Sequence, residues 1–242
     1  MFMNQLIKYI TAFYRLSRIK VIVADYFILL TGVSIMSTEN KVALPYLIIA
    51  TLISLSIHCY SFIVNDLEDA EDDALDDKKK LRNPISSGYI TYNQGFIILQ
   101  LTSIPALIAS FAFGGINAFM VAFAAILTGH LYSWKVVRFK AYPILDIVSH
   151  SFALAGFQPI LFNSFTGGTF SSSFWLVYIG VTLISVGGAL YNQLRDYDVD
   201  VQSNLNNTTI FFGKRLSKAL FILAYLLGFV LNFAAIIQYI KK

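Results

Sequence analysis

Long runs of apolar residues, separated by shorter polar stretches, dominate the chain. A helix of about 20 residues crosses the hydrocarbon layer of a bilayer. Lipid offers no partner to unpaired backbone groups, so runs of this length must be helical. The pattern predicts seven membrane-spanning helices, at residues 20–37, 42–64, 92–112, 115–133, 144–163, 172–194 and 217–240.

The polar connections between these segments differ sharply in charge. Three are highly charged and follow the second, fourth and sixth segments, at residues 65–91, 134–143 and 195–216. Of the 18 Lys and Arg residues, all but Lys41, Lys241 and Lys242 lie on the face that also carries the N-terminus. Because Lys and Arg accumulate on the cytoplasmic side of membrane proteins, we expect the N-terminus and the charged loops to be cytoplasmic.

Composition supports the same class. Hydrophobic residues make up 57% of the chain and charged residues 13%, whereas a soluble domain carries about 25% charged residues. We predict an all-α, multi-pass protein integral to the lipid bilayer, with one transmembrane domain over residues 1–242 and no nucleic-acid partner. Oligomerisation stays open. No cleavable signal peptide is evident, and the single cysteine, Cys59, cannot form an internal disulfide.

Acidic residues gather at the end of the second segment, which the charge rule for topology does not explain. Residues 65–77 read NDLEDAEDDALDD. Three of the carboxylates are spaced i, i+3 and i+7 and so share one face of a helix. Neighbouring aspartates, Asp72 and Asp76, offer a second register, so the spacing leaves the working set open. The row consists of Asn65, Asp66, Asp69 and Asp73.

A second acidic row ends the sixth segment, in the sequence YNQLRDYDVD. Asn192, Asp196 and Asp200 are spaced i, i+4 and i+8 and again share one face, with Asp198 roughly opposite. Both rows continue a predicted membrane helix on the same side of the membrane. We interpret them as a weak internal repeat of helix-end motifs.

Closely spaced carboxylates repel one another unless they are solvated or bind cations. Oxygen ligands with one or two carboxylates per ion, completed by water and phosphate, suit Mg²⁺. Two such sites that face each other could clamp a diphosphate, and nearby basic residues would neutralise its remaining charge. An ordinary solvated acidic loop is the alternative, which the matching second row disfavours. The basic residues are Lys78, Lys79, Lys80, Arg82, Lys135, Arg138, Lys140 and Arg195.

The pattern resembles the UbiA superfamily of intramembrane prenyltransferases over residues 14 to about 220. The first family motif, NDxxDxxxD, is present as NDLEDAEDD, and the second, DxxxD, lies within QLRDYDVD. The RPxxSG turn is present as RNPISSG, and the loop after the fourth helix reads YSWKVVRFK.

Several positions depart from the family pattern. Asn83 precedes Pro84 in the turn, the fourth-helix loop lacks two prolines, and Asn204 replaces an expected glycine before Thr208 or Thr209. Family members usually have nine helices, whereas about seven are predicted here, so one side of the bundle is expected to be open.

The resemblance implies transfer of a prenyl group from a prenyl diphosphate to a hydrophobic acceptor, with two Mg²⁺ ions. Tyr132 would cover the reacting prenyl carbon. The catalytic set would be Tyr132 with Asp66, Asp69, Asp196 and Asp200. The ligands of metal and diphosphate would be Asn65, Asp66, Asp69, Asp73, Asp196 and Asp200. The further diphosphate partners would be Arg82, Arg138, Lys140 and Arg195.

Three other functions compete with prenyl transfer. A cation transporter with an acidic vestibule is disfavoured because transporters bind ions near the membrane midplane. A CDP-alcohol phosphotransferase requires an Asp-Gly and Ala-Arg pattern that the sequence lacks. The two complete Asp rows argue against the third alternative, a non-catalytic isoprenoid-binding member of the same family. Acceptor identity and prenyl length are not predicted from the sequence.

Three ionisable residues within the apolar segments stand apart from the motifs. Asp25 is a candidate for acceptor binding, since carboxylates in membrane helices are often functional, or it pairs with Arg18. Asp146 and His150 are spaced i, i+4 and could act together as a base for the acceptor or form a helix-stabilising pair.

Overall fold

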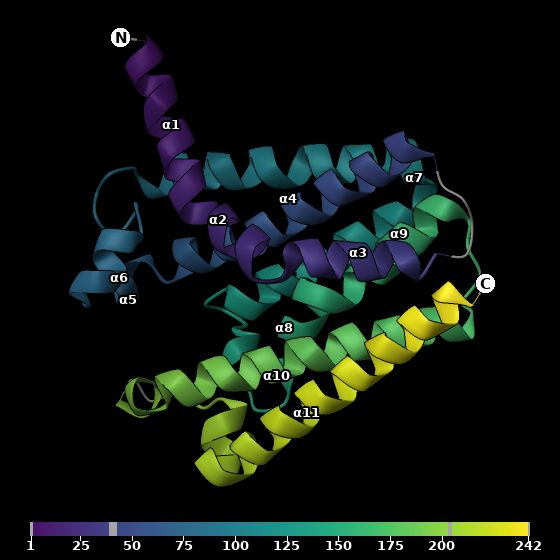
Figure 1. The fold of residues 1–242 in the computed structure, drawn as a ribbon. Coiled ribbons are helices and arrows are strands. Elements are labelled where there is room, and N and C mark those ends of the chain that lie inside the picture. Colours follow the sequence, from purple (N-terminus) through teal and green to yellow (C-terminus); the bar gives the residue numbers. More distant parts are fainter. Residues whose placement is uncertain (1, 39–42, 203–204, 242) are drawn as a thin grey trace.

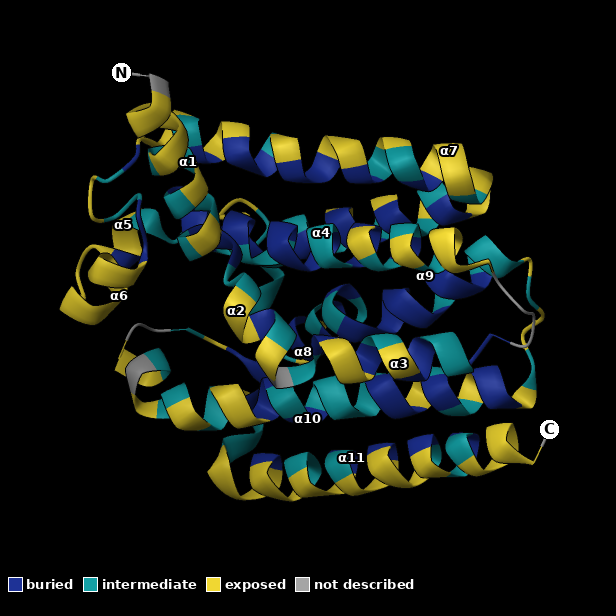
Figure 2. Ribbon diagram, turned by 45° about the horizontal axis from the view of Figure 1, so that its top comes forward, coloured by how far each residue is buried: buried dark blue, intermediate teal, exposed yellow. Residues whose placement is uncertain are grey.

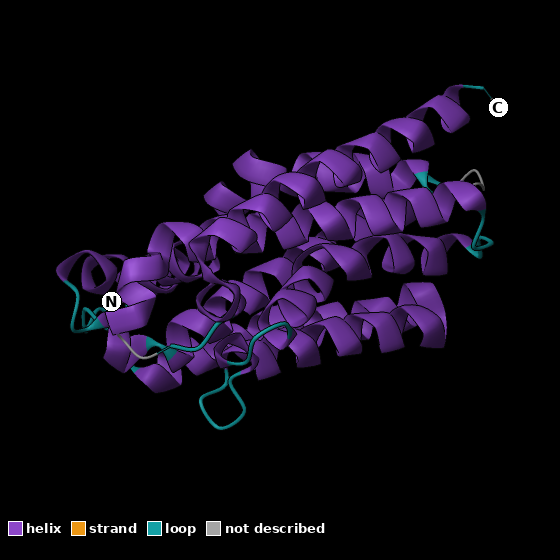
Figure 3. Ribbon diagram, turned by 90° about the horizontal axis from the view of Figure 1, so that it is seen from below, coloured by secondary structure: helices purple, strands orange, loops and turns teal. Residues whose placement is uncertain are grey.

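The computed structural model describes residues 2–38, 43–202 and 205–241 (Figure 1). Every regular element within these ranges is a helix (Figure 3). The long helices are α1 (Phe2–Ser17), α4 (Leu44–Glu68), α7 (Tyr92–Ser133), α10 (Ser172–Gln202) and α11 (Thr208–Ile240). The shorter ones are α2 (Ile19–Ile22), η1 (Val23–Phe27), α3 (Ile28–Met36), α5 (Ala70–Asp73), α6 (Asp77–Arg82), η2 (Phe139–Ala141), α8 (Leu145–Ser151), η3 (Phe152–Gly156) and α9 (Phe157–Thr166).

Local sequence signals explain where several helices begin. α7 starts with a capping box, in which Thr91 Oγ1 accepts a hydrogen bond from the Gln94 backbone and Gln94 Oε1 accepts one from the Thr91 backbone. Asn207 caps α11 by accepting from the Ile210 backbone N–H at 3.0 Å. Pro45 lies in the first turn of α4, where backbone N–H groups have no partner within the helix, so the missing N–H of proline costs no hydrogen bond.

Each of the seven predicted segments corresponds to one or more helices in the described part of the chain. Five helical stretches in the described part of the chain are long and apolar enough to cross a membrane, at Leu44–Glu68, Tyr92–Ser133, Leu145–Thr166, Ser172–Asp198 and Thr208–Ile240. The first predicted segment, 20–37, corresponds to α2, η1 and α3, with a π-helical turn in the middle. The fifth, 144–163, is likewise interrupted by the π-helical η3 between α8 and α9.

α7 is a pair of antiparallel helices that reverse at Gly115. Gly115 has φ 70° and ψ −167°, a conformation that is almost restricted to glycine. A straight helix of 42 residues would be about 63 Å long, yet both ends of α7 lie beside Glu68. Glu68 accepts from the Lys135 backbone N–H at 2.9 Å and also hydrogen-bonds the Tyr92 side chain. The separate predictions of 92–112 and 115–133 are therefore confirmed.

Two helix pairs form the sides of the bundle. α4 packs against α7, and α10 packs against α11, while the α8–η3–α9 segment lies between the pairs and contacts both α7 and α10 (Figure 1). Buried side chains such as Ile57, Phe157 and Leu161 fill the interior. Much of α11 is exposed (Figure 2). The exposed residues of this helix include the apolar Leu226 and Phe233. An apolar outer surface is suited to contact with lipid.

The charged connections meet at one end of the bundle. α5, α6 and the end of α10 lie at the left in Figure 1, whereas the C-terminus lies at the opposite end. The second charged connection contacts the first there, since Lys135 pairs with Glu71 at 2.9 Å and Arg138 with Asp72 at 3.2 Å. This arrangement confirms that the acidic rows share one face of the bundle. That this face is cytoplasmic stays a prediction from the positive residues.

Candidate active site

The first acidic row is built around Asp66, in the last turn of α4. Its side chain is fully buried, and Oδ1 accepts hydrogen bonds from the guanidinium groups of Arg18 and Arg82. A buried carboxylate requires such partners, because its charge is otherwise very costly to remove from water. Arg18, at the junction of α1 and α2, therefore pairs with Asp66. The side chain of Asp25, for which a pairing with Arg18 was one expectation, lies outside the described part of the structure.

Asn83 holds the loop after α6 against this row. It is fully buried, and its amide donates to the Asp66 backbone oxygen at 2.7 Å and to Asp73 Oδ2 at 3.0 Å. Its own oxygen accepts from the Ile85 backbone N–H at 3.0 Å. Arg82 bridges the same two aspartates, at 3.3 Å from Asp66 and 3.1 Å from Asp73. The departure from the family's Arg-Pro turn thus supplies an amide that organises the site.

Asp69 faces the connection between α7 and α8. Lys140 Nζ lies 2.6 Å from Asp69 Oδ2 and 3.3 Å from Asn65 Oδ1, and Arg138 lies 3.6 Å from Asp69. Burial lowers the pKa of Lys140, and the negative charge of Asp69 opposes that effect. Ser133 also donates to Asn65 at 3.4 Å. The structure therefore brings Asn65, Asp69, Arg138 and Lys140 together.

The second acidic row is more exposed. Arg195 pairs with the neighbouring Asp196 through two hydrogen bonds of 3.0 and 3.1 Å. Asp200 Oδ2 accepts from the Asn207 amide at 2.8 Å. Burial and the charge of Asp196 raise the pKa of Asp200, whereas Lys79 and Lys140 act in the opposite direction.

Lys140 and Tyr132 lie between the two rows. Lys140 bonds to Asp69 in the first row and lies near enough to Asp200 in the second to act on it electrostatically. Tyr132, near the end of α7, is within electrostatic range of Asp69, Asp200 and Asp146. Carboxylates of the two acidic helix ends, far apart in sequence, therefore lie near the same lysine and the same tyrosine.

Asp146 anchors the start of α11. Its carboxylate accepts from the Gln193 side chain at 2.7 Å, from the Thr208 backbone at 2.8 Å and from the Thr208 hydroxyl. Thr209 N–H in turn donates to Gln193 Oε1 at 3.0 Å. The i, i+4 pairing of Asp146 with His150 is not formed, and the carboxylate is instead occupied by donors of α10 and α11. His150 instead lies beside Tyr132, with ring centroids 5.8 Å apart.

The carboxylates of the site fit a divalent cation such as Mg²⁺. Asp66 Oδ2 is enclosed and has no hydrogen-bond partner in the described structure, and such an oxygen is a suitable ligand for a hard cation. Among the described residues, no three His, Cys, Asp or Glu side chains are gathered as a metal site. Asp66, Asp69 and Asp73 are each paired with a basic side chain instead.

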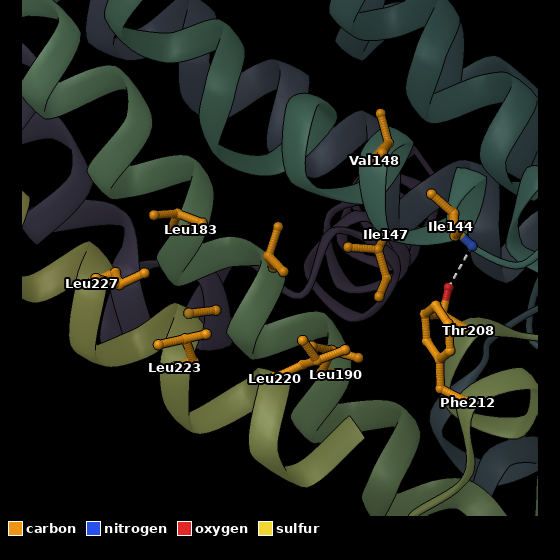
Figure 4. A pocket seen from close by; sticks show the side chains of 12 residues that line it. Ile144, Ile147, Val148, Leu183, Leu190, Thr208, Phe212, Leu220, Leu223 and Leu227 are labelled. Atoms are coloured by element: carbon orange, nitrogen blue, oxygen red, sulfur yellow. Dashed lines mark hydrogen bonds between the residues drawn. The ribbon is translucent and has the colours of Figure 1, made fainter. Parts of the chain in front are cut away.

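An apolar pocket of about 260 Å³ lies between α8, α10 and α11 (Figure 4). It is lined by Ile144, which precedes α8, and by Ile147 and Val148 on that helix. Asp146 and His150 project from roughly the opposite side of α8. Thr208 Oγ1 accepts from the Ile144 backbone at the pocket's edge, at 2.6 Å.

Comparison with known proteins places this architecture. A model of the UbiA prenyltransferase family matches residues 26–240, and the chain belongs to that family. A lycopene elongase/hydratase from Corynebacterium glutamicum is 25% identical over 196 residues, a match that covers 76% of this chain and 63% of the relative. The chain thus matches less than two thirds of that relative's length.

Solved structures confirm the fold. A UbiA homolog from Archaeoglobus fulgidus bound to GPP and Mg²⁺ has a TM-score of 0.74 and 19% identity, over 95% of this chain and 86% of that one. The same homolog bound to DMAPP and Mg²⁺ has a TM-score of 0.73 and 18% identity, with the same coverage. A digeranylgeranylglyceryl phosphate synthase has a TM-score of 0.70 and 18% identity, over 90% of this chain and 76% of that one. At this level of identity the likeness establishes a UbiA-type helix bundle.

Sequence reasoning missed several residues of the site. Arg18, Asn83, Gln193 and Asn207 each bond to an acidic side chain of the two rows or to Asp146. Asn83 was noted only as a departure from a motif. Asn83 is buried because the loop after α6 folds back on α4, and no pattern in the sequence indicates that this loop folds back.

Proposed function

We propose that the protein transfers a prenyl group from a prenyl diphosphate to a hydrophobic acceptor within the membrane, with Mg²⁺. The observation that carries this proposal is the meeting of two acidic helix ends around Lys140 and Tyr132, at one end of an apolar bundle. A charged headgroup would be held there while its hydrocarbon tail lies among the helices. The UbiA homologs bound to GPP or DMAPP with Mg²⁺ support the same ligand class.

Each acidic row would contribute differently to binding. Asn65, Asp66, Asp69 and Asp73 would hold one metal, and Asp196 with Asp200 the other. The bound Mg²⁺ would neutralise diphosphate oxygens and so favour departure of the diphosphate.

The basic side chains that pair with these carboxylates would turn to the diphosphate. Arg82, Arg138, Lys140 and Arg195 each lie within 3.6 Å of an Asp oxygen of one of the rows, so small rotations would bring them to phosphate oxygens placed between the rows. Positive groups fixed in that position stabilise negative charge as it develops on the leaving group. The buried helices around Tyr132 would keep water from the allylic cation.

The acceptor class we favour is an isoprenoid hydrocarbon. The relative from Corynebacterium glutamicum, named lycopene elongase/hydratase, supports this choice. A transport function is weaker, because α5 and the end of α10, which carry the acidic residues, lie at one end of the bundle rather than midway along it (Figure 1).

Diphosphate release by the purified protein in liposomes tests the proposal. The donors are dimethylallyl, geranyl and geranylgeranyl diphosphate, and the acceptors are lycopene and 4-hydroxybenzoate, each with Mg²⁺ or with EDTA. We expect release that needs both Mg²⁺ and one acceptor, together with a prenylated product. Binding of the donor without release in any combination would favour a non-catalytic isoprenoid-binding protein.

A further inference from the structure

His150 occupies an unusual position beside the site. It lies on α8, and its ring faces the ring of Tyr132 at 5.8 Å between centroids. Nδ1 is enclosed and has no hydrogen-bond partner, whereas Nε2 is not enclosed. A buried polar atom without a partner is unfavourable, so its retention next to Tyr132 requires an explanation.

The other two histidines are committed to structural contacts. Both ring nitrogens of His58 lie close to backbone carbonyl oxygens, at 2.7 Å from Ser54 and 2.8 Å from Leu154. His130 Nδ1 lies 3.0 Å from the Tyr60 hydroxyl. Within the described part of the chain, His150 makes no such bond.

Neighbouring ionisable groups leave the His150 ring available. Asp146, one turn earlier on α8, is occupied by Gln193 and Thr208. Tyr132, on α7, is in ring contact with His150, and His150 forms no ion pair within the described part of the chain. An imidazole in this setting can accept a proton without first breaking an ion pair.

We propose that His150 contacts the acceptor and accepts, at Nε2, the proton that the acceptor loses. This inference rests on the proposed prenyl transfer. The C1–O bond of the prenyl diphosphate breaks, and its electron pair leaves with the diphosphate. The acceptor double bond then attacks C1 and forms a carbon–carbon bond, which leaves a cation on the acceptor. Loss of a proton from the adjacent carbon to His150 restores a double bond, and the imidazolium later releases that proton to water.

The position of His150 agrees with this order of events. The His150 ring contacts Tyr132, and Tyr132 is in turn within electrostatic range of Asp69 and Asp200. With a diphosphate held by the acidic rows, His150 would therefore lie on the far side of Tyr132, where the acceptor would meet the reacting carbon. A base at that point would act on the acceptor and would not compete for the metal-binding carboxylates.

The test compares His150→Ala and His150→Gln with the wild type in the liposome assay, with dimethylallyl diphosphate and lycopene, or with whichever acceptor the wild type prenylates. Products are separated by liquid chromatography and mass spectrometry. His130→Gln is the matched control, since it removes a histidine that already has a partner. We expect kcat to fall about 100-fold or more for both His150 variants, with an unchanged KM for the prenyl diphosphate and normal Mg²⁺-dependent binding of the donor.

Two further measurements separate a proton acceptor from a packing residue. Added imidazole should restore part of the activity of His150→Ala and none of that of His150→Gln, which fills the space. The hydrated product should also increase relative to the alkene, because a cation that does not lose its proton to His150 is trapped by water. Two results would overturn the proposal while leaving prenyl transfer intact. One is an unchanged kcat and product ratio in both variants. The other is a loss of activity that imidazole does not restore, together with an unchanged product ratio. Absence of turnover by the wild type would overturn both.

Discussion

Replacement of Asn83 by alanine should loosen the first acidic row without unfolding the bundle. The change removes the donor to the Asp66 backbone oxygen and to Asp73, and the acceptor for the Ile85 backbone N–H. Neutral hydrogen bonds contribute about 1 kcal/mol each and those to a charged group about 1.5–3 kcal/mol, so the loop loses about 4 kcal/mol of local ordering. The long helices do not depend on these contacts.

Amide hydrogen exchange of the protein in lipid nanodiscs measures this effect. A loss of about 4 kcal/mol corresponds to several hundredfold more frequent opening, at tenfold per 1.4 kcal/mol. We expect amides in residues 70–91 to exchange about 100-fold faster or more, while those of α4 and α10 keep their protection. Asn93→Ala is the matched control, because Asn93 is exposed on the first turn of α7. Equal exchange of residues 70–91 in wild type and Asn83→Ala would refute the bridging role of Asn83.

Three other predictions concern turnover and stability. Asp66→Ala and Asp196→Ala should each abolish Mg²⁺-dependent diphosphate release, while thermal unfolding in detergent stays cooperative. Full activity in both variants would contradict the binding of Mg²⁺ and diphosphate by the two acidic rows. Asp146→Ala should lower the melting temperature, because about 3 kcal/mol of hydrogen bonds to Gln193 and Thr208 is lost; a melting temperature equal to that of the wild type would count against it. Gly115→Val should lower the free energy of unfolding by about 1–3 kcal/mol, because φ is 70° at this position. Gly32→Val, at an open helical position, is the control in the same denaturation experiment.

Much of the fold follows from the spacing of apolar residues. Seven apolar segments of suitable length predicted the helices, and the alternation of charged loops predicted that both acidic rows lie at the same end. The hairpin at Gly115 was also visible in the sequence, because a 42-residue apolar run exceeds what one membrane crossing requires. The π-helical turns within 20–37 and 144–163 were not predicted, since they depend on packing between helices.

The site was less predictable than the fold. Asp66 and Asp73 lie together, as their spacing predicts, and Arg82 bridges them. Asp69 lies at the break between α4 and α5 and pairs with Lys140 instead. Arg18 and Asn83 come from other segments, and their bonds to this row depend on tertiary contacts that no local pattern encodes. Asp146 is also affected by tertiary contacts that a local pattern does not encode. Its spacing to His150 suggested a pair, but the carboxylate instead accepts hydrogen bonds from α10 and α11.

The central claim is that both acidic rows hold one diphosphate. Its most direct test is the affinity of a non-reacting prenyl thiodiphosphate for the wild type, Asp66→Ala and Asp196→Ala, measured with Mg²⁺ or EDTA in liposomes. We expect tight binding that requires Mg²⁺ in the wild type, and loss of the Mg²⁺-dependent part in either single variant. Retention of Mg²⁺-dependent affinity after removal of either row would show that the rows act independently, and it would contradict a shared diphosphate site.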